Sequence, residues 1–219
     1  DLSREGNQPF KTKNGSILIF NGEIYNHYSI RRIIEKNIKV SWKGTSDTET
    51  LIQFLENFSI DVVLENLEGM FSFIYYNKKN NKIIFTRDLA GEKPLYFHVN
   101  KNYINFSSTL SPIAEFKNFE KQIDHKSLSN YKKYSYIPFP NTVYKSVFKL
   151  PPASYMIIDL NNFDFKNFMN FKDLINCKGI SFKEWWHPSR YLNQSLDRIN
   201  QNFDKQKKIL KNNLTQSVD

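Results

Sequence analysis

An amide, an unshielded backbone N–H and a carboxylate stand side by side in the segment Phe20 to His27, which reads FNGEIYNH. The side chain of Asn21 and the N–H of Gly22 are the donor types that stabilise an oxyanion. The Glu23 carboxylate suits the ammonium group of a small amino-acid substrate. The Asn-Gly pair is also the commonest two-residue turn signal, because both residues tolerate positive φ. The dipeptide alone favours a plain turn.

A strand and a helix are expected on either side of this segment. Residues 16–19 form an apolar run that predicts a strand, and residues 28–37 carry isoleucines at helical spacing. We therefore expect the segment to connect the strand to the helix. His27 could face the active cleft, but we favour a surface residue at the helix start, and we interpret residues 40–42 as a brief strand.

A second acidic group opens the next predicted helix, residues 47–58. Ser46 has the residue type of an N-cap, and Glu49 follows it at the spacing of a capping box. From spacing alone, Asp47 and Glu49 complement the positive end of the helix dipole. The pattern by itself thus gives both acids a structural role.

Paired β-rich runs dominate the middle of the chain. Polar loops separate residues 70–76 from 82–87 and residues 95–99 from 103–107, so each pair predicts a hairpin. Successive strands with few helices between them favour antiparallel sheets. Further expected elements are short helices at 110–116 and 124–131 and a strand at 154–160.

Four segments together resemble one known family. They are residues 20–27, 46–50 (SDTET), 67–73 (LEGMFSF) and 87–97 (RDLAGEKPLYF). In order and spacing they resemble the glutaminase domain of glutamine-hydrolysing asparagine synthetases, which are class II, N-terminal-nucleophile amidotransferases. The resemblance covers residues 1–160 and implies a four-layer αββα sandwich of antiparallel sheets.

The resemblance implies a role for each residue of the first segments. Asn21 and Gly22 match donors of the family's oxyanion hole, where both also contact L-glutamine. Glu23 and Asp47 match the acids that pair with the ammonium group of L-glutamine, whereas Glu49 keeps its capping role. In the family, the thiol of an N-terminal cysteine attacks the side-chain amide of glutamine, with its own α-amino group as the base.

The family's nucleophile has no counterpart in this sequence. The one cysteine, Cys177, is not an N-terminal residue and lacks the neighbours that activate a thiol. We interpret the chain as an amidotransferase domain truncated at its N-terminus and expect it to be inactive alone. A non-catalytic glutamine-binding module is the alternative.

Arg87 and Asp88 end a predicted strand shortly before Gly91 and Pro94. We interpret them as an ion pair that fixes the tight connection, since buried paired charges mostly set geometry. The resemblance implies that both residues give structural support to the site.

The last part of the chain departs from the strand pattern. Residues 161–194 interleave phenylalanines with Asn and Lys and include Trp185-Trp186, and we interpret them as an aromatic-rich linker. Residues 195–219 show the apolar spacing of an amphipathic helix. The resemblance identifies this helix with the start of the family's synthetase domain, an α/β ATP-pyrophosphatase domain.

The resemblance also implies the wider reaction. Ammonia released from L-glutamine would amidate L-aspartate to L-asparagine, through an adenylate formed with ATP and Mg²⁺ in the synthetase domain. No glycine-rich phosphate loop occurs in these 219 residues. An amidotransferase acting on another carboxylate, such as a sugar acid of a polysaccharide, is the alternative. Formation of a homodimer stays open.

Composition argues against several other classes of protein. The net charge is +9, but the lysines are scattered, so we do not expect nucleic-acid binding. No apolar run reaches the length of a membrane span. A single cysteine allows no internal disulfide, which favours the cytoplasm. The four histidines lie far apart, so we expect no metal site.

Overall fold

The computed structural model describes residues 6–189 and 203–218, which fall into two units. The first unit ends at Trp185 and contains both sheets. The second begins at Trp186, and its described part includes helix α8 (Phe203–Val218). No helix among the described residues is both long and apolar enough to cross a membrane.

The larger sheet has six strands in the order β1-β2-β3-β4-β8-β9, and neighbouring strands are antiparallel. They are β1 (Phe10–Lys11), β2 (Ile17–Ile24), β3 (Gly69–Asn77), β4 (Lys82–Arg87), β8 (Ser154–Asp159) and β9 (Ile180–Glu184). β2 pairs with β3 over its whole length, whereas β1 covers only Ile17 and Leu18 on the opposite edge. The second half of β2 therefore has a strand on one side only.

The smaller sheet has three antiparallel strands in the order β6-β5-β7. They are β5 (Tyr96–Val99), β6 (Ile104–Ser107) and β7 (Val147–Lys149). Both predicted hairpins are confirmed, as β3 pairs with β4 and β5 with β6. The polar loops between them set these local pairings.

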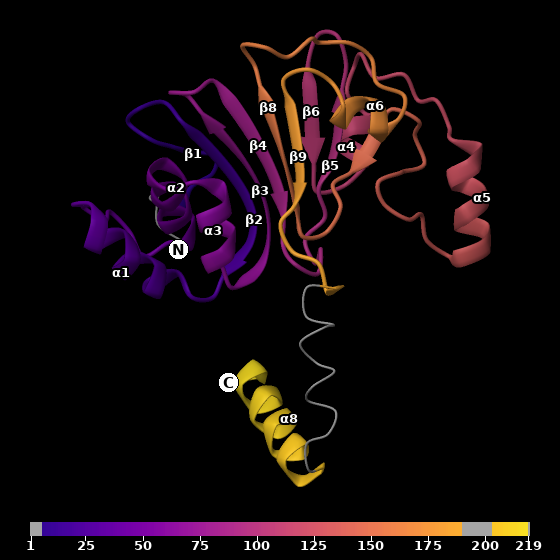
Figure 1. The fold of residues 1–219 in the computed structure, drawn as a ribbon. Coiled ribbons are helices and arrows are strands. Elements are labelled where there is room, and N and C mark those ends of the chain that lie inside the picture. Colours follow the sequence, from indigo (N-terminus) through magenta and orange to yellow (C-terminus); the bar gives the residue numbers. More distant parts are fainter. Residues whose placement is uncertain (1–5, 190–202, 219) are drawn as a thin grey trace. The chain divides into compact units, whose positions relative to one another are not determined.

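Helices cover the outer faces of the two sheets, so the first unit has four layers (Figure 1). The helices beside the larger sheet are α1 (His27–Asn37), α2 (Asp47–Asn57) and α3 (Ile60–Asn66). The short helix α4 (Ser111–Ala114) packs on the smaller sheet through Ile113 and Val147. Helices α5 (His125–Tyr134) and α6 (Phe171–Ile175) complete the unit.

Aromatic side chains fill the space between the two sheets. Phe85 from β4 meets Phe97 from β5, with ring centroids 5.7 Å apart, and Phe148 from β7 joins the same cluster. On the other face of the larger sheet, Leu18 and Phe20 of β2 pack among the helices. The core on the helix side therefore holds β2 against the helices. The mixed α+β sandwich agrees with the expected fold class.

The Asn21-Gly22 pair lies inside β2 and not in a connection. Gly22 stays in register opposite Phe71, and the strand continues to Ile24. The turn interpretation is therefore wrong, because pairing with β3 overrides the local turn preference. The strand expected at residues 40–42 is also wrong, since this segment is irregular and packs side chains against the core. Helix α3 was not predicted from the sequence.

Residues 161–185 hold more structure than a linker needs. β9 adds a strand to the larger sheet beside β8, and Phe163 and Phe168 are buried in the core between the sheets. Strand pairing and core burial, rather than surface docking, therefore account for these aromatics. Of the helix expected over 195–219, residues 203–218 are helical, and residues 195–202 lie outside the described residues.

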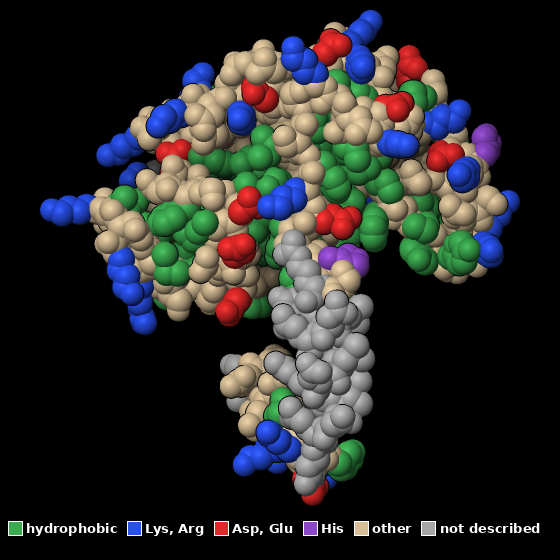
Figure 2. Space-filling model, viewed as in Figure 1, with side chains coloured by type: hydrophobic (Ala, Val, Ile, Leu, Met, Phe, Trp, Pro, Cys, Tyr) green, Lys and Arg blue, Asp and Glu red, His purple; other side chains and the backbone are tan. Residues whose placement is uncertain are grey.

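Basic side chains do not gather on the face of the first unit shown in Figure 2. Lys and Arg are spread over it and alternate with Asp and Glu. This face therefore shows no basic patch of the kind that binds nucleic acid.

Candidate functional site

The free edge of β2 carries three backbone N–H groups that point away from β3. The N–H of Phe20 donates to Gln8 Oε1 at 2.7 Å, and the N–H of Ile24 donates to Asp47 Oδ2 at 3.0 Å. N–H groups alternate sides along an antiparallel strand, so the N–H of Gly22 points to the same edge. Two side chains thus cap the donors on either side of Gly22. Sequence patterns did not single out Gln8.

Gly22 also lies where the backbone of β3 leaves no room for a side chain. Its φ is +147°, and a Cβ at this position would lie 2.1 Å from the carbonyl oxygen of Met70. Gly69 on β3 has φ +153°, and its Cβ would lie 2.1 Å from the carbonyl oxygen of Glu23. Both positions therefore require glycine. A missing side chain leaves the N–H of Gly22 unshielded.

A cavity of about 390 Å³ opens at this end of β2. Its lining includes Gly22, Glu23 and Asp47, together with His27 and Met70. The structure therefore brings together three of the four residues expected to contact L-glutamine. Two carboxylates and one backbone donor meet in a space that suits a small zwitterion.

The fourth residue, Asn21, faces elsewhere. Its side chain lines a separate cavity of about 250 Å³, with Ser72 of β3 and Phe106 of β6 among the other lining residues. Asn21 thus faces β6 of the smaller sheet, whereas Glu23 lies near the end of β2. In this arrangement the Asn21 amide and the Gly22 N–H do not share one cavity.

Asp47 is positioned by the start of α2. Ser46 caps this helix, because its Oγ accepts the N–H of Thr48 at 3.0 Å. The bond from the N–H of Ile24 then ties the first residue of α2 to the last residue of β2. The predicted N-cap is confirmed. The tie to β2 is a tertiary contact that spacing along the chain did not reveal.

Arg31 holds the loop before α2 and was missed by sequence reasoning. Its guanidinium donates to Thr50 Oγ1 at 2.8 Å and to the carbonyl oxygens of Gly44 and Ser46, each at 3.0 Å. It also lies over the ring of Trp42, 4.2 Å from the centroid. The available signal was an arginine within the apolar stripe of α1, where it is buried. Arg31 thereby fixes the loop that leads to Asp47.

Glu49 is bound to this loop as well as lying in the first turn of its helix. Its carboxylate accepts the N–H of Lys43 at 2.9 Å and the N–H of Gly44 at 3.0 Å. It also forms an ion pair with Arg31 at 3.7 Å. These bonds run to the loop and not to the N–H of Ser46, as a capping box would require. The structure therefore makes Glu49 a buried anchor for the loop instead of the expected capping residue.

His27 lines the cavity, so its interpretation as a plain surface residue is wrong. Within the described part of the chain, its Nδ1 is buried without a hydrogen-bond partner. Burial lowers the pKa of His27, and the nearby Asp47 carboxylate only partly offsets this effect. The imidazole is therefore neutral at pH 7 and adds no positive charge beside the two acids.

Arg87 binds backbone carbonyls and does not pair with Asp88. Its guanidinium donates to Lys93 O at 2.8 Å, to Leu150 O at 2.6 Å and to Gly91 O. Burial lowers the pKa of Arg87. Among the described side chains, no ion pair joins Arg87 to Asp88. The ion-pair interpretation is therefore wrong, because backbone groups are nearer partners for both charges.

Asp88 fastens β3 to the loop after β4. Its carboxylate accepts the N–H groups of Phe71, Glu92 and Lys93 at 3.1, 2.9 and 3.0 Å. Phe71 is the residue opposite Gly22. Asp88 thus supports the β3 backbone at the residue opposite the half-buried Gly22.

Neither the cysteine nor a metal cluster belongs to this cavity. Cys177 is half-buried and packs against the core between the sheets. In the part of the chain that the structure describes, no group of three or more His, Cys, Asp or Glu side chains is placed to hold a metal ion. The cavity offers acids and backbone donors.

Comparisons with known proteins agree with this arrangement. A model of the glutamine amidotransferase domain matches residues 1–169. The chain is 28% identical over 185 residues to a putative asparagine synthetase (glutamine-hydrolyzing) 2 of Methanocaldococcus jannaschii, covering 77% of this chain and 35% of that protein. It is 30% identical over 154 residues to asparagine synthetase (glutamine-hydrolyzing) 1 of Bacillus subtilis, covering 70% and 24%.

Solved structures show the same fold. The glutamine phosphoribosylpyrophosphate amidotransferase of B. subtilis matches with a TM-score of 0.52 and 16% identity, covering 84% of this chain and 33% of that one. Identity at this level supports the fold alone. The chain spans about a third or less of the curated relatives described above.

Proposed function

This chain belongs to the glutamine amidotransferase domain family, and from that premise we propose that the cavity at the end of β2 binds L-glutamine for the release of ammonia. One observation carries the proposal: the carboxylates of Glu23 and Asp47 and the edge of Gly22 line the same cavity. An α-ammonium group between two carboxylates forms charge-assisted hydrogen bonds.

Each group then has a chemical task. Glu23 and Asp47 hold the ammonium group, and Asp47 does so with Oδ1, because its Oδ2 accepts the N–H of Ile24. In this structure Oδ1 accepts the hydroxyl of Thr48 at 3.5 Å, which is long for a hydrogen bond. The N–H of Gly22 and the amide of Asn21 stabilise the oxyanion that forms when a thiolate adds to the side-chain carbonyl carbon. Loss of one such donor raises a barrier by roughly 3 kcal/mol. Use of Asn21 requires its side chain to turn toward the Gly22 edge.

The thiol that attacks is proposed to be the N-terminal cysteine of the mature protein. Its α-amino group takes the thiol proton and then passes a proton to the departing nitrogen. The C–N bond breaks, ammonia leaves, and water hydrolyses the thioester to L-glutamate. Cys177 does not fit this task, because it packs in the core away from the cavity lining.

We further propose that the released ammonia amidates L-aspartate in a cytoplasmic asparagine synthetase. The names of the relatives support this acceptor. ATP and Mg²⁺ would activate the aspartate carboxylate. The described residues offer no cluster of metal ligands, so we assign no residue of this chain to either group.

The test begins with the coding sequence upstream of Asp1. The protein encoded by the full reading frame is purified and supplied with L-glutamine, L-aspartate, ATP and Mg²⁺. Release of L-glutamate coupled to formation of L-asparagine supports the whole proposal. Release of L-glutamate without L-asparagine excludes aspartate as the acceptor. Failure to release L-glutamate, with L-glutamine still bound, supports the non-catalytic binding module instead.

A further inference from the structure

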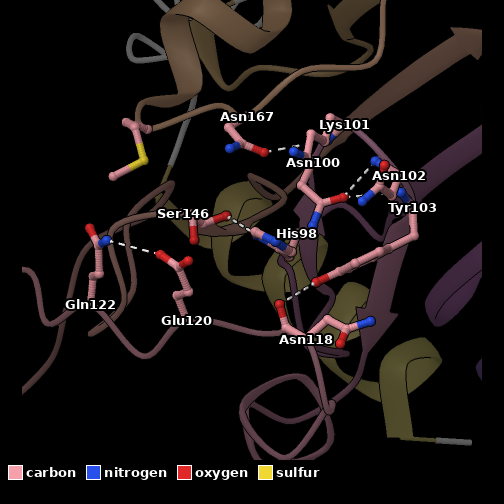
Figure 3. A pocket seen from close by; sticks show the side chains of 11 residues that line it. His98, Asn100, Lys101, Asn102, Tyr103, Asn118, Glu120, Gln122, Ser146 and Asn167 are labelled. Atoms are coloured by element: carbon pink, nitrogen blue, oxygen red, sulfur yellow. Dashed lines mark hydrogen bonds between the residues drawn. The ribbon is translucent and has the colours of Figure 1, made fainter.

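A second polar cavity lies on the outer side of the smaller sheet, away from the proposed glutamine site. It has a volume of about 260 Å³, and its walls come from the end of β5, the β5–β6 turn, residues 118–122, Ser146 and residues 167–169 (Figure 3). Ligand pockets commonly span about 300 to 1,000 Å³. This one therefore suits a molecule smaller than most drugs.

His98 is the buried centre of this cavity (Figure 3). Its side chain is only 7% exposed and touches the rings of Tyr103 and Phe119. Nδ1 lies 2.8 Å from the carbonyl oxygen of Ser146, which can only accept, so Nδ1 carries the proton. Burial lowers the pKa of His98. The ring is therefore neutral, and Nε2 offers a lone pair.

The acceptor on His98 decides which kind of group a ligand must present. A hydroxyl group can donate to Nε2 and can still accept a hydrogen bond from another donor. Asn105 lies directly opposite His98 in the β5–β6 ladder but is not among the residues that line the cavity, so it has no part in the site.

Amide groups on the rim of the cavity add further hydrogen-bond donors and acceptors. The Oδ1 of Asn100 accepts two backbone N–H groups, so its Nδ2 is left to donate. The Oδ1 of Asn167 accepts the N–H of Lys101 at 3.4 Å, which again leaves an NH₂ group. Gln122 donates to Glu120 at 3.3 Å and keeps a carbonyl oxygen.

Charge does not dominate the lining. Lys101 and Glu120 contribute one charge of each sign, and both are exposed. The buried acceptor on His98 is neutral. A strongly anionic or cationic ligand would gain little here, whereas a neutral ligand with several hydroxyl groups can satisfy donors and acceptors in turn.

We propose that this cavity binds a monosaccharide or a closely similar small polyol, with one hydroxyl group donating to Nε2 of His98 and others bound by the rim amides. The site is separate from the proposed glutamine site and does not depend on its chemistry. The hydrogen bonds that recognise the ligand come from His98, Asn167 and Gln122.

The test follows the imidazole nitrogens of His98 by long-range ¹H–¹⁵N NMR in the 219-residue chain. D-glucose, D-galactose, D-ribose and N-acetyl-D-glucosamine are each titrated to millimolar concentration, where weak carbohydrate affinities are measurable. We expect at least one of them to shift the Nε2 resonance in a saturable manner. Asn167→Ala and Gln122→Ala should each weaken that affinity about tenfold, the value of one net hydrogen bond.

Asn37→Ala on α1 is the matched control, because this exposed asparagine of the same unit does not line the cavity and should leave the affinity unchanged. L-glutamine is titrated as well. The proposal is overturned if no sugar moves Nε2 saturably, or if Asn167→Ala and Asn37→Ala bind the sugar equally. It is also overturned if L-glutamine shifts Nε2 with an affinity equal to that of the best sugar.

Discussion

The carboxylate of Asp47 accepts the backbone N–H of Ile24 at 3.0 Å, across 23 residues of sequence. One side chain thereby closes the edge of β2, opens α2 and stands in the cavity beside Glu23. The second oxygen, which accepts the Thr48 hydroxyl at 3.5 Å, is the one that we propose binds the ammonium group. A substitution can separate this proposed binding role from the structural role.

Asp47→Asn should impair binding of L-glutamine while sparing the fold. The amide oxygen can still accept the N–H of Ile24, but the charge that pairs with the ammonium group is gone. We expect a loss of affinity on the order of 100-fold, which corresponds to a lost charge pair, and little change in the melting temperature. Isothermal titration calorimetry with L-glutamine measures the affinities of the unsubstituted protein and of Asp47→Asn. Asp164→Asn, at an exposed position, is the control. Equal affinities for all three proteins would remove Asp47 from the site.

Gly22→Ala should destabilise the protein strongly. The new Cβ would lie 2.1 Å from a backbone oxygen of β3, which cannot move without breaking the ladder. We expect a cost on the order of 3 kcal/mol or more in the free energy of unfolding. Gly15→Ala is the matched control, because φ is +88° there but the Cβ meets only a lysine side chain. It should cost about 1 kcal/mol. Urea denaturation measures the free energy of unfolding of both variants. Equal losses would argue against the close approach of β2 to β3.

Arg31→Met should loosen the loop before α2. The substitution removes three hydrogen bonds and leaves the buried Glu49 without its cation. Breaking a buried pair in this way costs about 3 kcal/mol, and the weaker anchoring of Asp47 should also lower the affinity for L-glutamine. The neighbouring Arg32 is exposed on the same helix, so Arg32→Met should change neither quantity. Thermal denaturation and calorimetry measure the two effects, and a neutral Arg31→Met would refute the anchoring role.

The stability of the fold should fall as the pH drops below about 6.5, the ordinary pKa of histidine. Burial lowers the pKa of both His27 and His98 in the folded protein. Below their ordinary value, the unfolded chain takes up protons that the folded chain refuses, so the free energy of unfolding decreases. Above it, both forms are neutral and these groups contribute no slope. Urea denaturation across this range should show a smaller decrease for His98→Gln than for the exposed His125→Gln. Identical slopes would contradict the buried neutral state of His98.

Local patterns were sufficient for the elements whose partners are near in sequence. The hairpins β3–β4 and β5–β6 followed from β-rich runs around short polar loops. Ser46 was recognised as a helix cap because the bond it makes reaches only two residues ahead. The four segments that resemble the amidotransferase family also led to the correct fold class, since the order of such segments is a property of the sequence.

Tertiary structure decided everything that depends on partners distant along the chain. Asn21-Gly22 has the local preference of a turn, yet β3 holds it in a strand, because Gly22 and Gly69 allow two backbones to approach. Arg31 received no role from the sequence, because its partners, the carbonyl groups of Gly44 and Ser46, lie 13 and 15 residues away along the chain. Arg87 and Asp88 are adjacent in sequence, but each found backbone partners instead of the other. Buried polar groups take whichever partners the packed chain brings within reach, and those partners are settled only when the two cores form.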